Sequence, residues 1–438
     1  MNYYRNVLLF LFLLVLPWQT RWIVQDVLMQ SEVTQYGRLS VYVFDVLLVG
    51  YLAVVLPVVV QQTRRWMDLS FVRRAALGCF GALVVWSVGS IFWSLEPRVA
   101  IVAAGHLLLA VGLFTAIVLD RDASPDVILA GIALGMMVPS LFGWIQSATQ
   151  SIGASTLLGI AAQDPAVLGT AVIEQTQGRW LRAYGSFPHP NIFGGFLAVG
   201  LVAVLGVIGR ARMQMSETLL WCATVVIAGA LILTASRGAW LAALLGVVVL
   251  LIGSRINNDR LFLQRLKKPV TIALVVMTIM VVSLGSILLT RFDVTNRLET
   301  QSVIERVDQW GDVGTLATQN ISSFVGGAGI GNMVFALEER QPLLHAWTYQ
   351  PAHNVFGLVL VELGALGLLL LIGLIAMTNW YLPRYWRHTS VLLACSLGIT
   401  VLALACVDHY LWTQPSGLYL LAICLAVILR LGEEARSH

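Results

Sequence analysis

The chain consists largely of apolar runs that are long enough to cross a lipid bilayer. Crossing the hydrocarbon core takes about 20 mostly apolar residues in one helix. Twelve such runs follow one another, near residues 6–24, 39–60, 72–93, 99–119, 127–148, 190–209, 217–235, 238–254, 269–290, 353–379, 390–407 and 410–430. Charged residues make up only 11% of the 438 residues, against about 25% in soluble domains. We therefore expect an all-α, polytopic membrane protein with about 12 transmembrane helices, forming a single membrane-embedded domain over residues 1–438.

The distribution of lysine and arginine predicts the orientation of these helices. Short cytoplasmic loops are enriched in both residues. With a cytoplasmic N-terminus and twelve spans, 17 of the 27 Lys and Arg residues fall in short loops on the inside. The other ten lie mainly in three longer segments, residues 19–38, 149–189 and 291–352. We therefore expect both termini inside, and the outer loop 149–189 and the large loop 291–352, ahead of span ten, outside.

The first informative outer segment is Arg182 to Asn191, which leads into the sixth apolar run. Prolines on both sides of His189 predict an extended backbone there, because a residue before proline avoids the helical region. Asn191 would make a good N-cap for the following helix. For Asn191 alone we favour a structural role, a capped helix entrance beside an incidental histidine. Arg182 is different, because an arginine just above a span can face into a cavity.

The second segment is Ser236-Arg237-Gly238, where an arginine sits between two apolar runs with no hydrophilic loop around it. A charge at the bilayer centre costs roughly 2.5–3.5 kcal/mol, and less towards the helix ends. Such a residue usually has a partner, an aqueous cavity or an anionic ligand. The alternative is a tight hairpin whose arginine reaches the lipid headgroups. We favour a functional role for Arg237, because a plain turn would use Asn or Gly at lower cost.

The third segment is the large loop 291–352. Apolar residues recur there at three- and four-residue spacing, as in an amphipathic helix that lies on the membrane face. They are Val303, Ile304, Val307, Trp310, Val313 and Leu316. Arg306 lies on this predicted helix. A glycine-rich run that includes Gly329 and Gly331 follows, and it is flexible enough to present backbone N–H groups to an anion.

The fourth segment is His353-Asn354, at the boundary between the large loop and the tenth apolar run. A lone histidine at a helix start is more often structural than catalytic. This one faces outward, beside Asn354, on the same membrane side as the arginines, which favours a functional role. Glu362 lies about 13 Å deeper along the helix, so we expect it to be a packing partner rather than a catalytic acid.

Together these segments resemble the O-antigen ligase superfamily (Wzy_C-like), which also contains O-antigen polymerases and protein O-oligosaccharyltransferases. The matching motifs are R-x-x-G-x-F-x-H-P-N at 182–191, S-R-G-A-x-L at 236–241, R-x-x-x-W at 306–310 followed by G-x-G-x-G-N, and H-N-x9-G-x-x-G at 353–367. They occur in the family's order and cover roughly residues 180–370. Residues 1–150 carry no motif of this family.

The resemblance implies a membrane-embedded glycosyltransferase of the GT-C type in the bacterial inner membrane, with its active site facing the periplasm. Such enzymes take a glycan from undecaprenyl pyrophosphate and attach it to an acceptor hydroxyl, which in lipopolysaccharide biosynthesis belongs to lipid A–core. The implied partners are this donor, a glycan or lipid A–core acceptor and membrane lipids, and not nucleic acid. The resemblance also implies a metal-independent enzyme without a cofactor, and the outer loops contain no D-x-D pair suited to Mg²⁺.

Carried over to this sequence, the family's essential histidine is His353, the predicted catalytic residue. The predicted pyrophosphate-binding residues are Arg182, Arg237 and Arg306. The residues expected to support the site are His189, Asn191, Asn354, Gly329 and Gly331.

Two alternatives stay open at this point. An O-antigen or exopolysaccharide polymerase would use the same donor with a second lipid-linked glycan as acceptor. A secondary transporter would also have twelve spans with both termini inside. The suspected residues cluster at one face rather than at mid-membrane, which favours a transferase.

Overall fold

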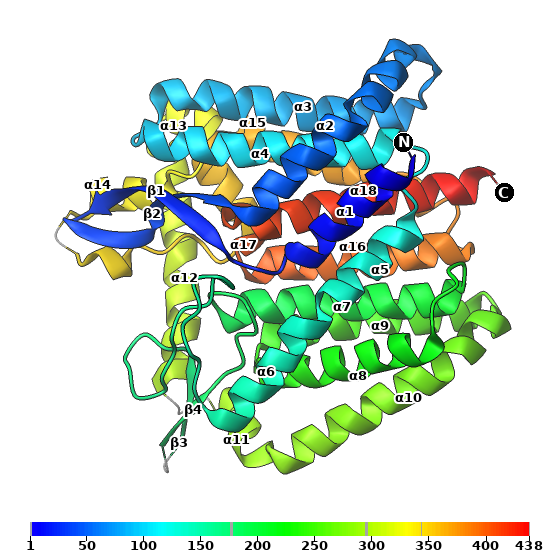
Figure 1. The fold of residues 1–438 in the computed structure, drawn as a ribbon. Coiled ribbons are helices and arrows are strands. Elements are labelled where there is room, and N and C mark those ends of the chain that lie inside the picture. Colours follow the sequence, from blue (N-terminus) through cyan, green and yellow to red (C-terminus); the bar gives the residue numbers. More distant parts are fainter. Residues whose placement is uncertain (1, 176–177, 294–296, 343, 438) are drawn as a thin grey trace.

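The computed structural model describes residues 2–175, 178–293, 297–342 and 344–437. Long helices lie side by side in a bundle, and two β-hairpins and several short helices gather at one end of it (Figure 1). Both chain termini lie at the opposite end, as predicted for an even number of passes (Figure 1). We call these the outer end and the inner end.

The long elements follow the predicted apolar runs closely. They are α1 (Asn2–Val15), α2 (Val43–Arg64), α3 (Phe71–Ser90), α4 (Pro97–Leu119), α5 (Pro125–Gly135), α6 (Met137–Thr149), α7 (Pro190–Arg210), α8 (Glu217–Leu233), α9 (Arg237–Ile256), α10 (Arg260–Ser283), α15 (Val355–Thr378), α16 (Thr389–Val407) and α18 (Pro415–Ser437). The shorter outer elements are β1 (Arg21–Met29), β2 (Glu32–Tyr42), β3 (Val172–Gln175), β4 (Gly178–Leu181), α11 (Gly285–Leu289), α12 (Arg297–Ala317), α13 (Ile321–Gly326), α14 (Met333–Arg340) and α17 (Tyr410–Thr413).

The number of spans differs from the predicted twelve. Among the described residues, ten helical segments are long and apolar enough to cross a membrane, with α5 and α6 counted as one. The two that fall short, α1 with 14 residues and α8 with 17, occupy the predicted positions. At about 1.5 Å per residue they are roughly 21 and 26 Å long, less than the roughly 30 Å of the hydrocarbon core. The protein is thus a multi-pass membrane protein with ten candidate spans.

The expectation of an all-α fold is wrong at the outer end. β1 and β2 form an antiparallel hairpin with Arg21 opposite Tyr42, and β3 and β4 form a second one. The first helix stops at Val15 because Pro17 and the β-branched and aromatic residues from Trp22 onward favour extended structure. Hydropathy alone predicts that the start of β1 belongs to the first span, because the apolar run extends to residue 24.

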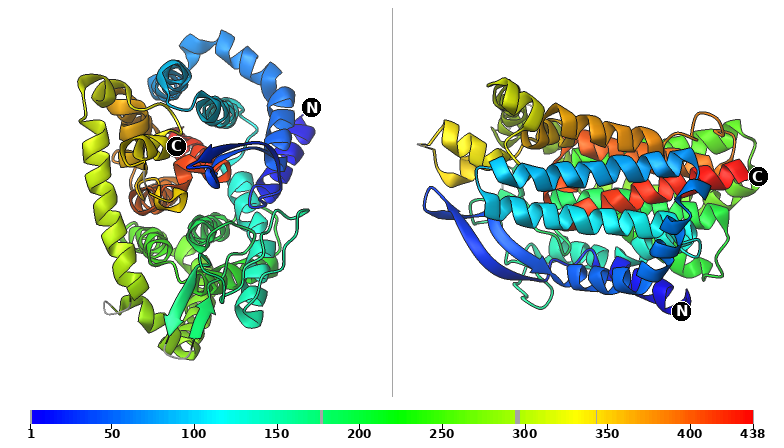
Figure 2. Two further views of the ribbon diagram at one scale, coloured as in Figure 1. Left: turned by 90° about the vertical axis from the view of Figure 1, so that its left-hand side faces the viewer. Right: turned by 90° about the horizontal axis from the view of Figure 1, so that it is seen from above.

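The first hairpin, β1–β2, projects beyond the ends of the long helices together with α14 (Figure 2). Its tip is attached there, because the Gln30 backbone N–H donates to the Glu338 carboxylate at 2.9 Å. In the end-on view the hairpin lies over the end of α18 (Figure 2). The hairpin therefore covers the middle of the outer end.

The predicted amphipathic helix in the large loop is confirmed as α12, which lies across the ends of the long helices (Figure 1). Val313 and Leu316 are buried against the protein, whereas Val307 and Trp310 are exposed. The side chain of Val303 lies outside the described residues. The apolar residues of α12 thus divide between a face on the protein and a face turned away from it.

At the inner end, basic residues of the short loops and helix ends form ion pairs. Arg210 on α7 forms a buried ion pair with Asp126 on α5 at 2.7 Å. Arg73 on α3 pairs with Glu433 on α18 at 2.7 Å. These pairs join the ends of helices that are distant in sequence, and they confirm that their basic residues lie on one side of the bundle.

Candidate functional site

The outer motifs meet where four connections come together at the outer end. Arg182 follows β4 and is only 6% exposed. Its Nε donates to the carbonyl of Thr234 at 2.8 Å, and its Nη2 donates to Oδ1 of Asn191 at 2.7 Å. The neighbouring backbone N–H of Ala183 donates to Leu233 at 3.0 Å. The connection before α7 is therefore fastened to the turn between α8 and α9.

His189 has the predicted extended backbone, with φ −149° and ψ 142°. It is itself the N-cap of α7, because its Nδ1 accepts the Asn191 backbone N–H at 3.1 Å. The predicted capping role of Asn191 is wrong. Pro190 takes the first helical position, which suits a residue with a fixed φ and no N–H, so the cap falls one residue before it. The Asn191 side chain instead positions Arg182.

Arg237 is the first residue of α9. Its Nη1 donates to the carbonyl of Arg291 at 2.8 Å, and Arg291 Nε donates back to the carbonyl of Ala235 at 3.1 Å. A Cβ on Gly238 would lie 2.8 Å from Val407, the last residue of α16. The start of α9 is thus packed against the end of α16, and Arg237 lies close to the α16–α17 connection.

His353 lies just before α15 and contacts α12. Its backbone N–H donates to Oε1 of Gln309 at 3.1 Å, and its ring Nδ1 lies 2.9 Å from the same oxygen. An amide oxygen only accepts hydrogen bonds, so Nδ1 carries the proton and Nε2 keeps its lone pair. Arg306 lies one turn before Gln309 on α12, close enough for its charge to act on the His353 imidazole. Gln309 thus sets the tautomer of His353.

The α16–α17 connection adds two residues that the sequence motifs did not include, Asp408 and His409. Both are 8% exposed. The rings of His353 and His409 are 5.1 Å apart at 74°. The ligand atoms of His353, Asp408 and His409 all lie within 4.8 Å of one another. They could have been found by the criterion that singled out Arg237, a charge in a very short outer turn between two apolar runs.

Burial determines the charge of this imidazole cluster. It lowers the pKa of His353, lowers that of His409 to about 4, and lowers that of His189, which also faces Arg182, to about 3. Burial alone would raise the pKa of Asp408, but attraction to the protonated forms of the three imidazoles and the His409 backbone N–H outweigh it and hold that pKa below its usual range. At neutral pH the cluster therefore consists of neutral imidazoles around one ionised carboxylate.

Residues 222–372 match the model of the Wzy_C family, described as O-antigen ligase. The protein is a membrane protein with an O-antigen ligase domain. The match includes Arg237, Arg306 and His353, and it extends from α8 into α15. Arg182 and Asp408 lie outside the matched range and reach the same place through the fold. A search of curated proteins found no match to the chain.

Members of the Wzy_C family transfer glycans in the manner of O-antigen ligases and polymerases. The ligase domain here brings His353 and Arg306 together, and the flanking regions supply Arg182, His189, Asp408 and His409. This geometry agrees with the predicted grouping of Arg182, Arg237 and His353 on one side of the membrane protein. The individual roles of these residues stay predictions.

The glycine run of the ligase domain has a packing role. Gly329 donates its backbone N–H to the carbonyl of Glu362 at 2.8 Å, and the backbone N–H groups of Gly331 and Met333 bind the Glu362 carboxylate. Trp412 Nε1 donates to the same carboxylate at 2.8 Å. The predicted anion-binding loop therefore holds the protein's own Glu362, which acts as the expected packing partner.

Two packing contacts explain the H-N-x9-G-x-x-G motif. Asn354 caps α15 by accepting the Gly357 N–H at 2.9 Å, and it donates to the carbonyl of Cys406 at 2.9 Å. Gly364 has φ +69° inside α15, and a Cβ there would overlap the carbonyl of Val325. Asn354 therefore ties α15 to α16, and Gly364 lets the α13 end approach the α15 backbone.

The ligand set of His353, Asp408 and His409 is also of a kind that holds transition metals. Two imidazoles and a carboxylate are common ligands of zinc and iron. The Nδ1 atoms of His353 and His409 each have a partner, Gln309 and Thr413, as the second nitrogens of metal-bound histidines do. The metal-independent chemistry implied by the resemblance is therefore a prediction that needs its own test.

Proposed function

We propose that the protein transfers a glycan from undecaprenyl pyrophosphate to an acceptor hydroxyl, in the manner of an O-antigen ligase. The proposed acceptor is lipid A–core or a similar glycan. The observation that carries the proposal is the meeting of Arg182, the Arg237 turn, His353 and Asp408 at the outer end. Such a site suits a reaction in which one group loses a proton while another gains negative charge.

The arginines act on the leaving group. When the bond between the anomeric carbon and the pyrophosphate oxygen breaks, that oxygen takes the electron pair. Arg182, Arg237 and Arg306 stabilise the new charge through their planar sets of N–H donors, which match phosphate oxygens. Each charge-assisted hydrogen bond is worth roughly 1.5–3 kcal/mol. Arg182 and Arg237 are held in place by backbone carbonyls, so they need little reorganisation during the reaction.

His353 acts on the acceptor. As the acceptor oxygen bonds to the anomeric carbon, its proton moves to the Nε2 lone pair of His353. Burial keeps the imidazole neutral at pH 7, which a base requires. The Asp408 carboxylate then stabilises the imidazolium that forms. General base catalysis of this kind typically contributes a factor of about 10²–10⁴ in rate.

We further propose that the inner end is cytoplasmic and that the reaction takes place at the periplasmic face of the bacterial inner membrane. The support is the concentration of arginines in the short inner loops, which marks the cytoplasmic side. A cysteine introduced at Arg297, whose side chain is 76% exposed on α12, should react with a membrane-impermeant maleimide in intact spheroplasts. Labelling only after lysis would show that the outer end faces the cytoplasm, which is the opposite orientation.

Reconstitution into vesicles with a pyrophosphate-linked donor and a glycan acceptor tests the reaction itself. Joint appearance of glycosylated acceptor and free undecaprenyl pyrophosphate is the expected result. Movement of the intact donor glycan across the vesicle membrane without cleavage would indicate a transporter instead. The His353→Gln variant in identical vesicles is the control for spontaneous hydrolysis.

The acceptor class is tested in the host cell. Deleting the gene should leave long lipid-linked donor chains while polymer disappears from the lipid A–core bands on a polysaccharide gel. Chains reduced to single repeat units would mean that the protein is a polymerase.

A further inference from the structure

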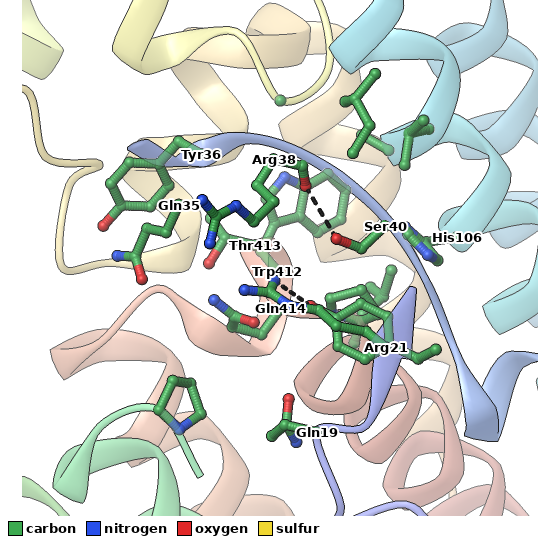
Figure 3. A pocket seen from close by; sticks show the side chains of 18 of the residues that line it. Gln19, Arg21, Gln35, Tyr36, Arg38, Ser40, His106, Trp412, Thr413 and Gln414 are labelled. Atoms are coloured by element: carbon green, nitrogen blue, oxygen red, sulfur yellow. Dashed lines mark hydrogen bonds between the residues drawn. The ribbon is translucent and has the colours of Figure 1, made fainter. Parts of the chain in front are cut away.

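A cavity of about 220 Å³ lies under the first hairpin, between β1–β2, α4 and the connection from α17 to α18 (Figure 3). A single water needs only about 10–15 Å³ of such space, so the cavity has room for a much larger polar group. Its walls come mainly from residues outside the matched O-antigen ligase domain. Of the predicted site residues Gly331 lines it, whereas the predicted catalytic and pyrophosphate-binding residues do not.

Three residues that line the cavity are neighbours of the imidazole cluster. Pro188, next to His189, and Pro351, two residues before His353, both line it. Thr413, a third lining residue, binds the His409 ring at 2.8 Å. A molecule in the cavity would therefore lie close to the imidazole cluster that includes His353.

Two of the arginines of the proposed pyrophosphate site, Arg182 and Arg237, lie on the other side of that cluster. Arg182 binds the carbonyl at the end of α8, and Arg237 is the first residue of α9. In Figure 1, α8 and α9 lie on one side of α17, and α4 with the hairpin lies on the other. An incoming hydroxyl needs space that the leaving pyrophosphate does not occupy. The cavity therefore has the right position for the acceptor rather than the donor.

The lining is chemically suited to a sugar. The amide side chains of Gln19, Gln35 and Gln414 and the indole of Trp412 face the same space (Figure 3). Amides can donate and accept at once, as hydroxyl groups require, and an aromatic face covers the C–H side of a sugar ring. Gln19 is only 7% exposed. Within the described residues, the Gln414 side chain makes no hydrogen bond to the protein.

Two arginines make the lining cationic. Arg38 on β2 uses its Nε to bind Asp26 at 3.0 Å, and its guanidinium extends among Gln35, Thr413 and Trp412 (Figure 3). Arg21 on β1 donates to the Tyr42 hydroxyl at 3.1 Å. The carboxylate that lines the cavity is Glu362, and it is occupied by Trp412 and the glycine run. The Asp26 carboxylate offsets one of the two arginine charges, and a neutral glycan would leave the other without a counterpart.

We propose that this cavity is the acceptor subsite and that it takes an anionic glycan, one that carries a carboxylate or a phosphate near the accepting sugar. The inference rests on the proposed glycan transfer and adds the chemical class of the acceptor. Arg38 binds the anionic group, and Arg21 supports it from the other strand.

Equilibrium dialysis of the full chain in detergent tests the subsite without any transfer. The probes are a tetrasaccharide of alternating glucose and glucuronate, the neutral glucose tetrasaccharide, and the neutral form carrying one phosphate ester. At least one acidic probe should bind about tenfold or more tightly than the neutral one, and which one does so identifies the anionic group. Equal binding of all three would overturn the proposal.

Variants assign the effect to the hairpin. Arg38→Gln should remove the preference for the acidic probe and leave the affinity for the neutral probe unchanged, which shows that the cavity still forms. Arg340→Gln removes the same charge from an exposed position on α14, outside the cavity, and should keep the preference. An unchanged preference in Arg38→Gln would contradict the assignment. Binding of phosphatidylglycerol with no binding of any glycan would make the cavity a lipid site and also overturn the proposal.

The two proposals fail in different ways. Dialysis on the His353→Gln background should still show the acidic preference, since binding does not need the base. If transfer to neutral and acidic acceptors is equally efficient in the wild type, the subsite proposal falls and the transferase stands. If no donor is cleaved although the acidic probe binds, the proposed function falls and the binding site stands.

Discussion

Two pairs of histidine and aspartate lie near the outer end, and they differ in what surrounds them. In the first, His106 on α4 lies 3.4 Å from Asp45 on α2. That carboxylate also accepts the Tyr42 backbone N–H at 2.8 Å and the Tyr419 hydroxyl at 2.7 Å. In the second, Asp408 lies among three imidazoles, beside the connections that carry the arginines.

The comparison shows that a histidine next to a carboxylate does not by itself indicate catalysis. Asp45 completes a capping box at the start of α2 and joins the hairpin to α4 and α18, so its bonds hold the fold. The Asp408 carboxylate accepts the His409 backbone N–H and acts on the neighbouring imidazoles through its charge. The site differs from its structural counterpart by the arginines on the connections around it, since His106 also lines the cavity.

Replacing His353 should have the largest effect. His353→Gln removes the Nε2 base, so kcat for glycan transfer should fall by a factor of about 10²–10⁴. Donor cleavage and acceptor glycosylation in reconstituted vesicles give the measurement. His106→Gln is the matched control, and at saturating acceptor its kcat should stay within about threefold of wild type. A similar loss of kcat in both variants would mean that His106 and His353 contribute equally to catalysis.

Replacing the aspartates separates catalysis from stability. Asp408→Asn removes the charge that stabilises the imidazolium, and kcat should fall about 10- to 100-fold. Asp45→Asn loses part of a buried hydrogen-bond network, at about 1–3 kcal/mol, so its Tm in detergent should fall more than that of Asp408→Asn. The two measurements are steady-state kinetics and thermal unfolding of the same preparations. If Asp45→Asn were the slower enzyme at saturating acceptor, the assignment of Asp408 would be wrong.

Arg237 tests what the cations contribute. Arg237→Ala should lower kcat/KM about tenfold or more, because a charge-assisted bond to the leaving group is lost. Arg237→Lys keeps the charge but not the planar pair of donors, and its activity should lie between Ala and wild type. Full activity in the lysine variant would show that charge alone matters at this position.

Removal of metal ions should have the smallest effect. If His353 acts as a base beside Asp408, dialysis against EDTA followed by assay in metal-free buffer should leave the transfer rate unchanged. Loss of activity that Zn²⁺ or Mn²⁺ restores would instead assign His353, Asp408 and His409 as metal ligands.

The elements that follow from local pattern could be predicted from the sequence. The long apolar runs predicted the spans, the three- and four-residue spacing predicted α12, and the flanking prolines predicted the extended backbone of His189. The β1–β2 hairpin was missed because its residues are nearly as apolar as a span, and hydropathy cannot distinguish a short apolar strand from the end of a helix.

The parts of the site that depend on distant contacts could not be predicted. Gln309 reaches His353 only because α12 packs against α15 in one register, and nothing local marks that register. A glycine-rich run looks the same in sequence whether it binds an external anion or Glu362. Asp408, by contrast, lay in a two-residue outer turn and was accessible to the reasoning that identified Arg237.

The pH dependence of kcat/KM tests most directly whether His353 is the base, because this quantity reports the ionisations of the free enzyme. Burial lowers the pKa of His353, Asp408 raises it and Arg306 lowers it. The acid limb of the wild type should therefore lie below the usual histidine value of about 6.5. It should move to lower pH in Asp408→Asn and to higher pH in Arg306→Gln. An acid limb that stays in place in both variants, or moves in the same direction in both, would contradict the account.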